Sequence, residues 1–313
     1  MSVEVGDGPQ DSRTGPPRVS VCVLNHNYAQ FLGQAIESCL AQEPGDYHLE
    51  EIVVLDDGST DESLDVCARY GDRVRVVPLE HGGFAATLTE SVRRCRGDWL
   101  ALLDADDWFA PGKLRTVAPR LRPGVRFVQH WEHVVDGEGQ PLVPGAHPGG
   151  NTSTLLVERA AVTQLLPVTN EKYFHVLDDL GHGIRLTEPL TAYRVHGANM
   201  TDRERPGVHQ TYMAGVCEGI ADRLTELRRR PPAWAGPTAL RRLAWHYRAE
   251  ARAHTVEAAL QQGRRGAAWL PLLGELVLTV LAGRSYASRG PSIRSVLTGR
   301  PCVRLEPTSR KAS

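Results

Sequence analysis

Short apolar runs that are typical of buried β-strands alternate with helical patterns over residues 19–104. The four runs lie at residues 19–24, 51–55, 74–77 and 99–103 and are rich in valine and leucine. Between them, apolar residues recur at every third or fourth position, as on the buried face of a helix. Strands and helices that alternate through short links form a mostly parallel sheet with right-handed crossovers. The sequence therefore predicts an α/β fold with an open, mostly parallel central sheet.

Polar side chains follow three of these predicted strands at the point where each run ends. Asn25 follows the first run, Asp56 and Asp57 follow the second, and a cluster with Asp104 and Asp106 follows the fourth. The carboxyl ends of parallel strands meet at one edge of a sheet, and ligands bind in the crevice at that edge. We therefore expect these side chains to line one crevice.

The sequence Leu-Asp-Ala-Asp-Asp at residues 103–107 is the sharpest chemical signal. Asp104 and Asp106 lie one residue apart at a strand end, so they can share a hard cation such as Mg²⁺ or Mn²⁺. Such a cation neutralises the charge that builds on a diphosphate leaving group. An acidic turn that caps the next helix is the alternative interpretation of the same residues.

The sequence Asp-Asp-Gly-Ser-Thr-Asp at residues 56–61 gives a second signal. A carboxylate at a strand end can accept a hydrogen bond from a nucleobase imide, and Gly58 allows a sharp backbone turn beside a ligand. The same residue types are common in turns and helix caps, so the run by itself also fits the passage from a strand to a helix.

Taken in order and with their spacing, residues 19–28, 56–61 and 103–107 resemble glycosyltransferase family 2. Residues 188–200 resemble the segment that closes the domain in that family, so the resemblance covers about residues 18–201. It implies a single domain of the A-type glycosyltransferase (GT-A) fold. It also implies a transferase that moves a sugar, with inversion, from a nucleotide diphosphate sugar to an acceptor hydroxyl, assisted by Mg²⁺ or Mn²⁺.

The resemblance further implies roles for individual residues. The nucleotide-binding residues that it implies are Asn25, Asn27, Asp56, Asp57, His81 and Asp104. The metal and diphosphate motif would consist of Asp104 and Asp106. His81 stands where many members have asparagine. His196 is a candidate third metal ligand or diphosphate contact because imidazole binds transition metals, and Arg194 could pair with phosphate. For both residues, a structural role in closing the domain is the alternative.

An inverting transfer needs a carboxylate that takes the proton of the acceptor hydroxyl. Similar proteins often carry this base in an acidic motif before the segment that resembles residues 188–200. Glu171 matches the position best, although Lys172 follows it where aspartate is usual. Asp178 lies two helical turns further along, on a similar face of a continuous helix, and Asp179 lies beside it. Glu171, Asp178 and Asp179 are therefore the candidate bases, with ordinary surface carboxylates as the alternative.

Two other functional classes compete with the transferase. The irregular motif at Glu171 also fits a catalytically silent module that binds nucleotide sugars. A nucleotidyltransferase would share the sheet and the metal chemistry, but residues 25–33 form no glycine-rich basic phosphate loop. A dinucleotide oxidoreductase is disfavoured because no GxGxxG follows the first strand. Nucleic-acid binding has little support, since no aromatic residues are interleaved with the basic ones.

We expect a disordered leader at residues 1–17, a GT-A domain at 18–205 and a helical, basic region at 206–313. The residues from Thr201 onward contain 19 Lys+Arg against 9 Asp+Glu, whereas the first 200 residues contain 17 against 28. The basic region could contact anionic lipid, an acidic partner or a second copy in a homodimer, with a solvated helical face as the alternative. The apolar stretch at 269–282 is short for a membrane span.

Six cysteines without a CxxC pair and the polar start of the chain favour a cytoplasmic protein, with peripheral contact to the inner face of the membrane as an option. The acceptor stays open among glycans, lipid-linked sugars and small molecules, because a fold of this kind supports many acceptors.

Overall fold

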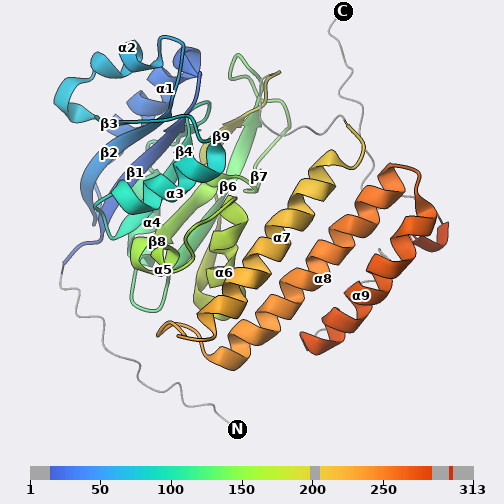
Figure 1. Ribbon diagram of the computed structural model, residues 1–313. Helices are drawn as coiled ribbons and strands as arrows, with labels where there is room; N and C mark the ends of the chain where they lie inside the picture. Colours follow the sequence, from blue (N-terminus) through green and yellow to red (C-terminus); the bar gives the residue numbers. More distant parts are fainter. Residues whose placement is uncertain (1–14, 198–204, 284–295, 299–313) are drawn as a thin grey trace, which may run out of the picture. The chain divides into compact units, whose positions relative to one another are not determined.

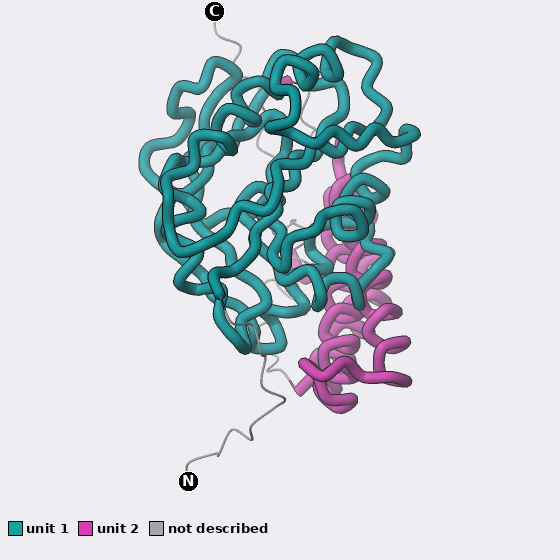
Figure 2. Tube along the Cα trace, turned by 90° about the vertical axis from the view of Figure 1, so that its left-hand side faces the viewer, with its two compact units in different colours: residues 1–196 teal, residues 197–313 magenta. Residues whose placement is uncertain are grey.

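The computed structural model describes residues 15–197, 205–283 and 296–298. They belong to two compact units, Met1–His196 and Gly197–Ser313, which are coloured separately in Figure 2. Most of the leader that we expect at residues 1–17 lies outside the described residues. The expected border between the domains, after residue 205, lies beyond the division of the two units at His196.

The first unit is built around one mixed sheet with the strand order β3-β2-β1-β4-β8-β6-β9-β5 (Figure 1). Its parallel half consists of β1 (Arg18–Asn25), β2 (His48–Asp57), β3 (Arg75–Leu79) and β4 (Trp99–Asp104). These are the four strands predicted from the apolar runs. The other half consists of β5 (Trp108–Phe109), β6 (Phe127–Val135), β8 (Leu155–Glu158) and β9 (Gly183–Arg194), while β7 (His147–Pro148) pairs with β6. In this half β8 is antiparallel to both β4 and β6, whereas β6 and β9 are parallel.

Helices cover both faces of the parallel half, which explains why its strands contain continuous apolar runs such as Ile52–Leu55. The first-unit helices are α1 (Ala29–Leu40), α2 (Ser63–Ala68), α3 (Phe84–Arg94), α4 (Lys113–Val117), α5 (Arg159–Thr163) and α6 (His175–Leu177). Leu32 and Ile36 of α1 are fully buried in the same core as Val21 of β1. Cys22, the next residue of β1, meets Cys95 at the end of α3 on the opposite face. Figure 1 shows α1 and α3 on these two sides of the sheet.

The described part of the second unit includes the long helices α7 (Val208–Leu227), α8 (Pro237–Gln261) and α9 (Trp269–Leu281). Residues of α8 and α9 share a small apolar core with Val296. The helical character that we expect for this region is therefore present in its described part. Within the described residues, no helix is both long and apolar enough to span a bilayer.

Candidate active site

The strand register brings the predicted polar ends to one edge of the sheet. Asn25, the last residue of β1, is paired with Asp56 of β2. Leu24, one residue earlier, is paired with Asp104 at the end of β4. Three of the five side chains expected to line one crevice thus lie at the carboxyl ends of three adjacent parallel strands, at the edge where ligands bind in such sheets.

Asn25 and Asn27 hold the loop that follows β2. Asn25 Nδ2 donates to Asp56 Oδ1 over 2.7 Å, and Ser59 donates to the same carboxylate through both its hydroxyl and its backbone N–H. Asn27 Oδ1 accepts from the backbone N–H of Thr60 over 2.7 Å. The backbone of Asn27 is left-handed, with φ of 56°. Asn25 Oδ1 is buried and has no hydrogen-bond partner among the described residues, so it can accept from a bound ligand.

Asp57 ties the end of β2 to the loop before α3. Its carboxylate accepts from the backbone N–H groups of Gly82 and Gly83, over 2.8 and 2.9 Å, and contacts His81 Nδ1 at 2.9 Å. The ring of His81 stacks on the ring of His26 with 4.3 Å between centroids. His81 therefore lies beside the loop that follows β2, and its side chain keeps 60% of its surface exposed.

His26, Asp57 and His81 each offer a metal-ligating atom within 4.8 Å of the others. Both Asp57 carboxylate oxygens already accept hydrogen bonds, and the Nδ1 atom of each imidazole contacts an Asp57 oxygen. We therefore interpret the cluster as a brace between two loops. The sequence did not single out His26, because its partnership with His81 depends on the pairing of distant strands.

The Asp-Ala-Asp-Asp turn after β4 concentrates carboxylates. Asp106 and Asp107 are 6% and 1% exposed. Burial, together with the neighbouring charges of Asp107, Asp106 and Glu171, holds the pKa of Asp104 well above its usual range. The pKa of Asp107 is also raised, first by burial and then by Asp106. Like charges in a buried setting disfavour one another, so either a proton or a nearby cation stabilises this turn.

His196 contacts the same turn. Its Nε2 atom lies 2.9 Å from Asp106 Oδ2, and its ring packs against the rings of Tyr28 and Phe31. Burial and the charges of Asp106 and Asp104 raise the pKa of Tyr28. An imidazole beside a carboxylate is a pair of donors that could ligate a divalent ion such as Mn²⁺. Of the residues predicted as metal ligands, His196 and Asp106 are in contact, and Asp104 lies two residues before Asp106 at the end of β4. Among the described residues, only His26, Asp57 and His81 place three such atoms within 4.8 Å of one another.

Asp107 plays a different part from Asp104 and Asp106. Its carboxylate accepts from the Ser153 hydroxyl over 2.6 Å and from the backbone N–H of Arg194 over 2.8 Å. Both oxygens are thereby used inside the protein. Asp107 therefore fixes the turn to two distant segments of the chain.

Arg194 donates hydrogen bonds that hold the acidic turn after β4, although the sequence also suggested that it could pair with phosphate. Its guanidinium donates to Asp106 O (2.8 Å), Gly137 O (2.6 Å) and Gln34 Oε1 (2.6 Å). The same group lies 4.5 Å from the ring centroid of Phe31 and 4.7 Å from that of Trp108. Three of its donors bond to these acceptors and its plane lies against two rings, and these contacts favour the structural role that was the alternative.

Glu171 lies close to the carboxylate cluster. It begins a one-turn 3₁₀ helix, Glu171–Phe174, which Asn170 caps by accepting from the backbone N–H of Lys172 over 2.9 Å. Burial raises the pKa of Glu171 to about 7, and its charge contributes to the raised pKa of Asp104. Of the three candidate bases, this is the one whose charge acts on the turn after β4.

Asp178 and Asp179 lie elsewhere. Asp178 forms an ion pair with Arg185 near the start of β9, with Nη2 and Oδ2 2.7 Å apart, and Asp179 is exposed. The first residue of β9 pairs with the start of β6, and β6 is connected through β8 to Leu100 of β4. The start of β9 therefore lies level with the start of β4. The two aspartates are therefore placed toward the edge of the sheet opposite Asp104, which corrects the idea that Asp178 shares a face with Glu171.

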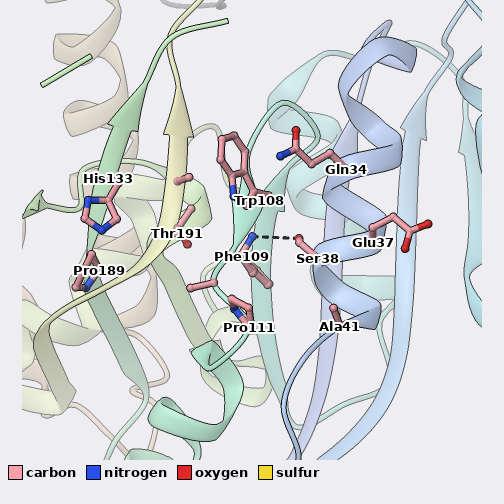
Figure 3. Close-up of a pocket in the computed structure, with 12 residues that line it drawn as sticks. Gln34, Glu37, Ser38, Ala41, Trp108, Phe109, Pro111, His133, Pro189 and Thr191 are labelled. Atoms are coloured by element: carbon pink, nitrogen blue, oxygen red, sulfur yellow. Dashed lines mark hydrogen bonds between the residues drawn. The ribbon is translucent and has the colours of Figure 1, made fainter. Parts of the chain in front are cut away.

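A groove of about 510 Å³ lies between α1 and the strands β5 and β9 (Figure 3). Gln34, Ser38 and Trp108 contribute to its walls, and the Phe109 backbone N–H donates to Ser38 Oγ over 3.1 Å. Its lining includes none of the carboxylates of the strand-end cluster. The groove adjoins that cluster through Gln34 and Trp108, which both contact Arg194.

Comparisons with known proteins agree with this geometry. Residues 20–155 match the family model described as glycosyl transferase family 2. An uncharacterised glycosyltransferase of Nostoc sp. is 30% identical over 215 residues, which are 58% of this chain and 66% of that protein. The chondroitin synthase of Escherichia coli is 32% identical over 134 residues, which are 41% of this chain and 19% of that enzyme. The chain thus spans less than two thirds of the length of these relatives.

The crystal structure of S. aureus TarS in complex with UDP-GlcNAc has a similar fold. The TM-score is 0.53 at 15% sequence identity, and the match covers 86% of this chain and 93% of that chain. At this identity the likeness concerns the fold alone, and it extends over both halves of the mixed sheet.

Proposed function

Because the chain belongs to glycosyltransferase family 2, we propose that it moves a sugar, with inversion, from a nucleotide diphosphate sugar to an acceptor hydroxyl. One observation carries this proposal. Burial and the charges of Asp107, Asp106 and Glu171 raise the pKa of Asp104 at the end of β4, which supports a turn that could hold a metal ion beside a carboxyl group that could take a proton. Transfer of a sugar between oxygens needs both features.

The nucleotide would bind over the ends of β1 and β2. Asn25 Oδ1 is the buried acceptor that a nucleobase imide N–H would satisfy. Asp56 and Asn27 hold the surrounding loop in place through hydrogen bonds within the chain. His81, with its exposed ring beside Asp57, would border the base or the ribose. These residues bind and orient the donor and take no part in proton transfer.

Asp104 and Asp106 would hold Mg²⁺ or Mn²⁺, with His196 as a third ligand. When bound, the ion neutralises the diphosphate as its bond to the sugar breaks. The fit rests on the raised pKa of Asp104 and on the 2.9 Å contact between His196 and Asp106. Asp107 and Arg194 keep the turn rigid, so that the two ligating carboxylates need no reorganisation when the donor arrives.

Glu171 would act as the general base. Its carboxylate takes the proton of the acceptor hydroxyl while that oxygen bonds to the anomeric carbon and the diphosphate oxygen leaves from the opposite side. A pKa of about 7 suits this role, because the group is ionised in part at neutral pH and still basic enough to hold the proton. The acceptor class stays open among glycans, lipid-linked sugars and small molecules.

The decisive experiment compares nucleotide release by the wild type, Asp106→Asn and Asp46→Asn with UDP-, GDP- and dTDP-sugars in the presence of Mn²⁺. Asp46 is an exposed loop carboxylate away from the strand ends, so its variant is the matched control. We expect Asp106→Asn to lower release by roughly a hundredfold or more. Wild-type activity in this variant would refute the metal role. Tight donor binding by the wild type without turnover across a broad acceptor panel would instead favour the silent binding module.

A further inference from the structure

The solvent-facing side of α9 is apolar along its whole length. Its exposed side chains are Trp269 (43%), Leu270 (79%), Leu273 (59%), Val277 (59%), Val280 (46%) and Leu281 (44%). At about 100° per residue, these six positions fall within an arc of about 120° on the helix surface. No other residue of the helix falls in that arc, so the arc carries no polar side chain.

The opposite side of the same helix is already packed. Leu272 lies in a core with Val256 and Leu260 of α8, and Glu275 and Thr279 are buried on that side as well. Glu275 is the only charged residue of α9, and it is 0% exposed. Helices at a protein surface normally turn their polar face to water and their apolar face inward. Because α9 is apolar on its outer face too, an apolar medium or partner is expected to cover that face.

We propose that this outer face of α9 lies on the surface of an anionic membrane, with the helix axis in the membrane plane. Thirteen residues make a helix about 20 Å long, too short to cross the hydrocarbon core but suited to an interfacial position. Trp269 begins the helix, and tryptophan is enriched at the boundary between lipid and water.

The charge of the second unit complements an anionic surface. Arg264 and Arg265 lie within five residues of the start of α9, and residues 205–283 contain 11 arginines, no lysine and 6 acidic residues. Arginine near an anionic leaflet adds electrostatic attraction to the burial of apolar side chains. This combination of an apolar stripe with a basic surround is what an interfacial helix requires.

A second copy of the chain fits the same face less well. A symmetric dimer would press two identical stripes together, and it would bring two net-positive units with it. The positive charges of two copies repel each other and weaken a dimer, whereas the positive charge of one copy strengthens its binding to anionic lipid. Coverage by the chain's own residues beyond α9 is the remaining alternative, and both alternatives are separable by experiment.

The test measures binding of the full-length protein to vesicles made of equal parts of phosphatidylcholine and phosphatidylglycerol, and to vesicles of phosphatidylcholine alone. The wild type should bind the mixed vesicles more tightly, and added salt should weaken this binding. The double variant Leu273→Glu/Val277→Glu should bind roughly tenfold more weakly for each side chain replaced. Both positions face solvent, so the fold should persist, which circular dichroism can check.

The matched control is Leu142→Glu/Val143→Glu, which adds the same two charges at exposed apolar positions of the first unit. It should bind vesicles as the wild type does. A concentration-dependent dimer in light scattering that the α9 double variant abolishes would overturn the proposal in favour of a second copy. A wild type that stays monomeric and binds no vesicles, or that binds both vesicle types equally, would overturn it as well. The readout needs no sugar transfer, so it is independent of the proposed function.

Discussion

The hydroxyl of Ser153 donates a hydrogen bond of 2.6 Å to Asp107 Oδ2. Ser153 Oγ also accepts from the backbone N–H of Asp104 over 3.0 Å. On its other side, the Ser153 carbonyl accepts from the buried Nζ of Lys113 over 2.7 Å. Ser153 therefore joins the acidic turn after β4 to the buried interior of the domain, from a segment 46 residues away along the chain.

Replacing this hydroxyl should loosen the acidic turn. In Ser153→Ala, a buried carboxylate and a backbone N–H both lose a partner, so the free energy of unfolding should fall by about 1–3 kcal/mol. We also expect kcat/KM to fall by about tenfold, because Asp104 is less firmly placed. Urea unfolding and a nucleotide-release assay measure the two effects. Thr163→Ala is the control, since that hydroxyl is exposed and bonds only to its own helix at Arg159 O. Equal behaviour of the two variants would contradict the role of Ser153.

Glu171 and Asp178 can be separated by a matched pair of amide variants. Glu171→Gln should lower kcat by about 10²–10⁴-fold, because the amide cannot take the acceptor proton, while donor affinity changes little. Asp178→Asn breaks only a surface ion pair with Arg185 and should leave kcat near the wild-type value. The wild-type rate should also fall as the pH drops below about 7, where Glu171 becomes protonated. An inactive Asp178→Asn beside an active Glu171→Gln would reverse the assignment.

The parallel half of the sheet could be predicted because its signals are local. The apolar runs and the polar residues that end them are contiguous in the sequence, and parallel pairing places such ends side by side. The register of Asn25 with Asp56 and of Leu24 with Asp104 confirms this convergence. The roles of these residues in binding and catalysis stay predictions.

The remainder of the site depends on contacts that no local pattern encodes. Arg194 and Asp106 O are 88 positions apart, and nothing around Ser153 distinguishes it from other loop serines. The grouping of Asp178 with Glu171 assumed one continuous helix. Instead, a 3₁₀ turn, Glu171–Phe174, gives way to the three-residue α6, and Gly181 adopts φ of 85°. The chain changes direction within ten residues, so helical periodicity does not apply.

Glu132 gives a prediction about pH and stability. This residue of β6 is 6% exposed, and burial raises its pKa from 4.5 to about 7, while Asn151 Nδ2 donates to it over 2.6 Å. The folded protein therefore holds a proton that the unfolded chain releases. The contribution of Glu132 to folding is fully present below pH 4.5 and is lost as the pH rises to about 7.

Glu132→Gln should remove this dependence, because the amide can still accept from Asn151 and carries no charge. The variant should be more stable than the wild type at pH 8, by an amount on the order of 3 kcal/mol, and the two should converge toward pH 4. Urea unfolding across that pH range provides the measurement. A constant difference between the two proteins at all pH values would show that Glu132 is not protonated in the folded state.

A comparison of Arg194 with Arg185 tests what a guanidinium contributes when its plane lies against two rings and its three nitrogens all donate hydrogen bonds. Arg194→Lys removes the fork that reaches Asp106 O, Gly137 O and Gln34, and it removes the flat contact with two aromatic rings. A lysine ammonium cannot satisfy these acceptors together, so we expect a loss of about 2–4 kcal/mol in unfolding free energy and weaker donor binding in the presence of Mn²⁺. Arg185→Lys keeps a charge beside Asp178 at an exposed position, and the loss in unfolding free energy should stay below about 1 kcal/mol.

Thermal and urea unfolding of the two variants, together with titration of the nucleotide, measure these effects. A comparable, small effect of both substitutions would mean that the acidic turn is held without the Arg194 brace.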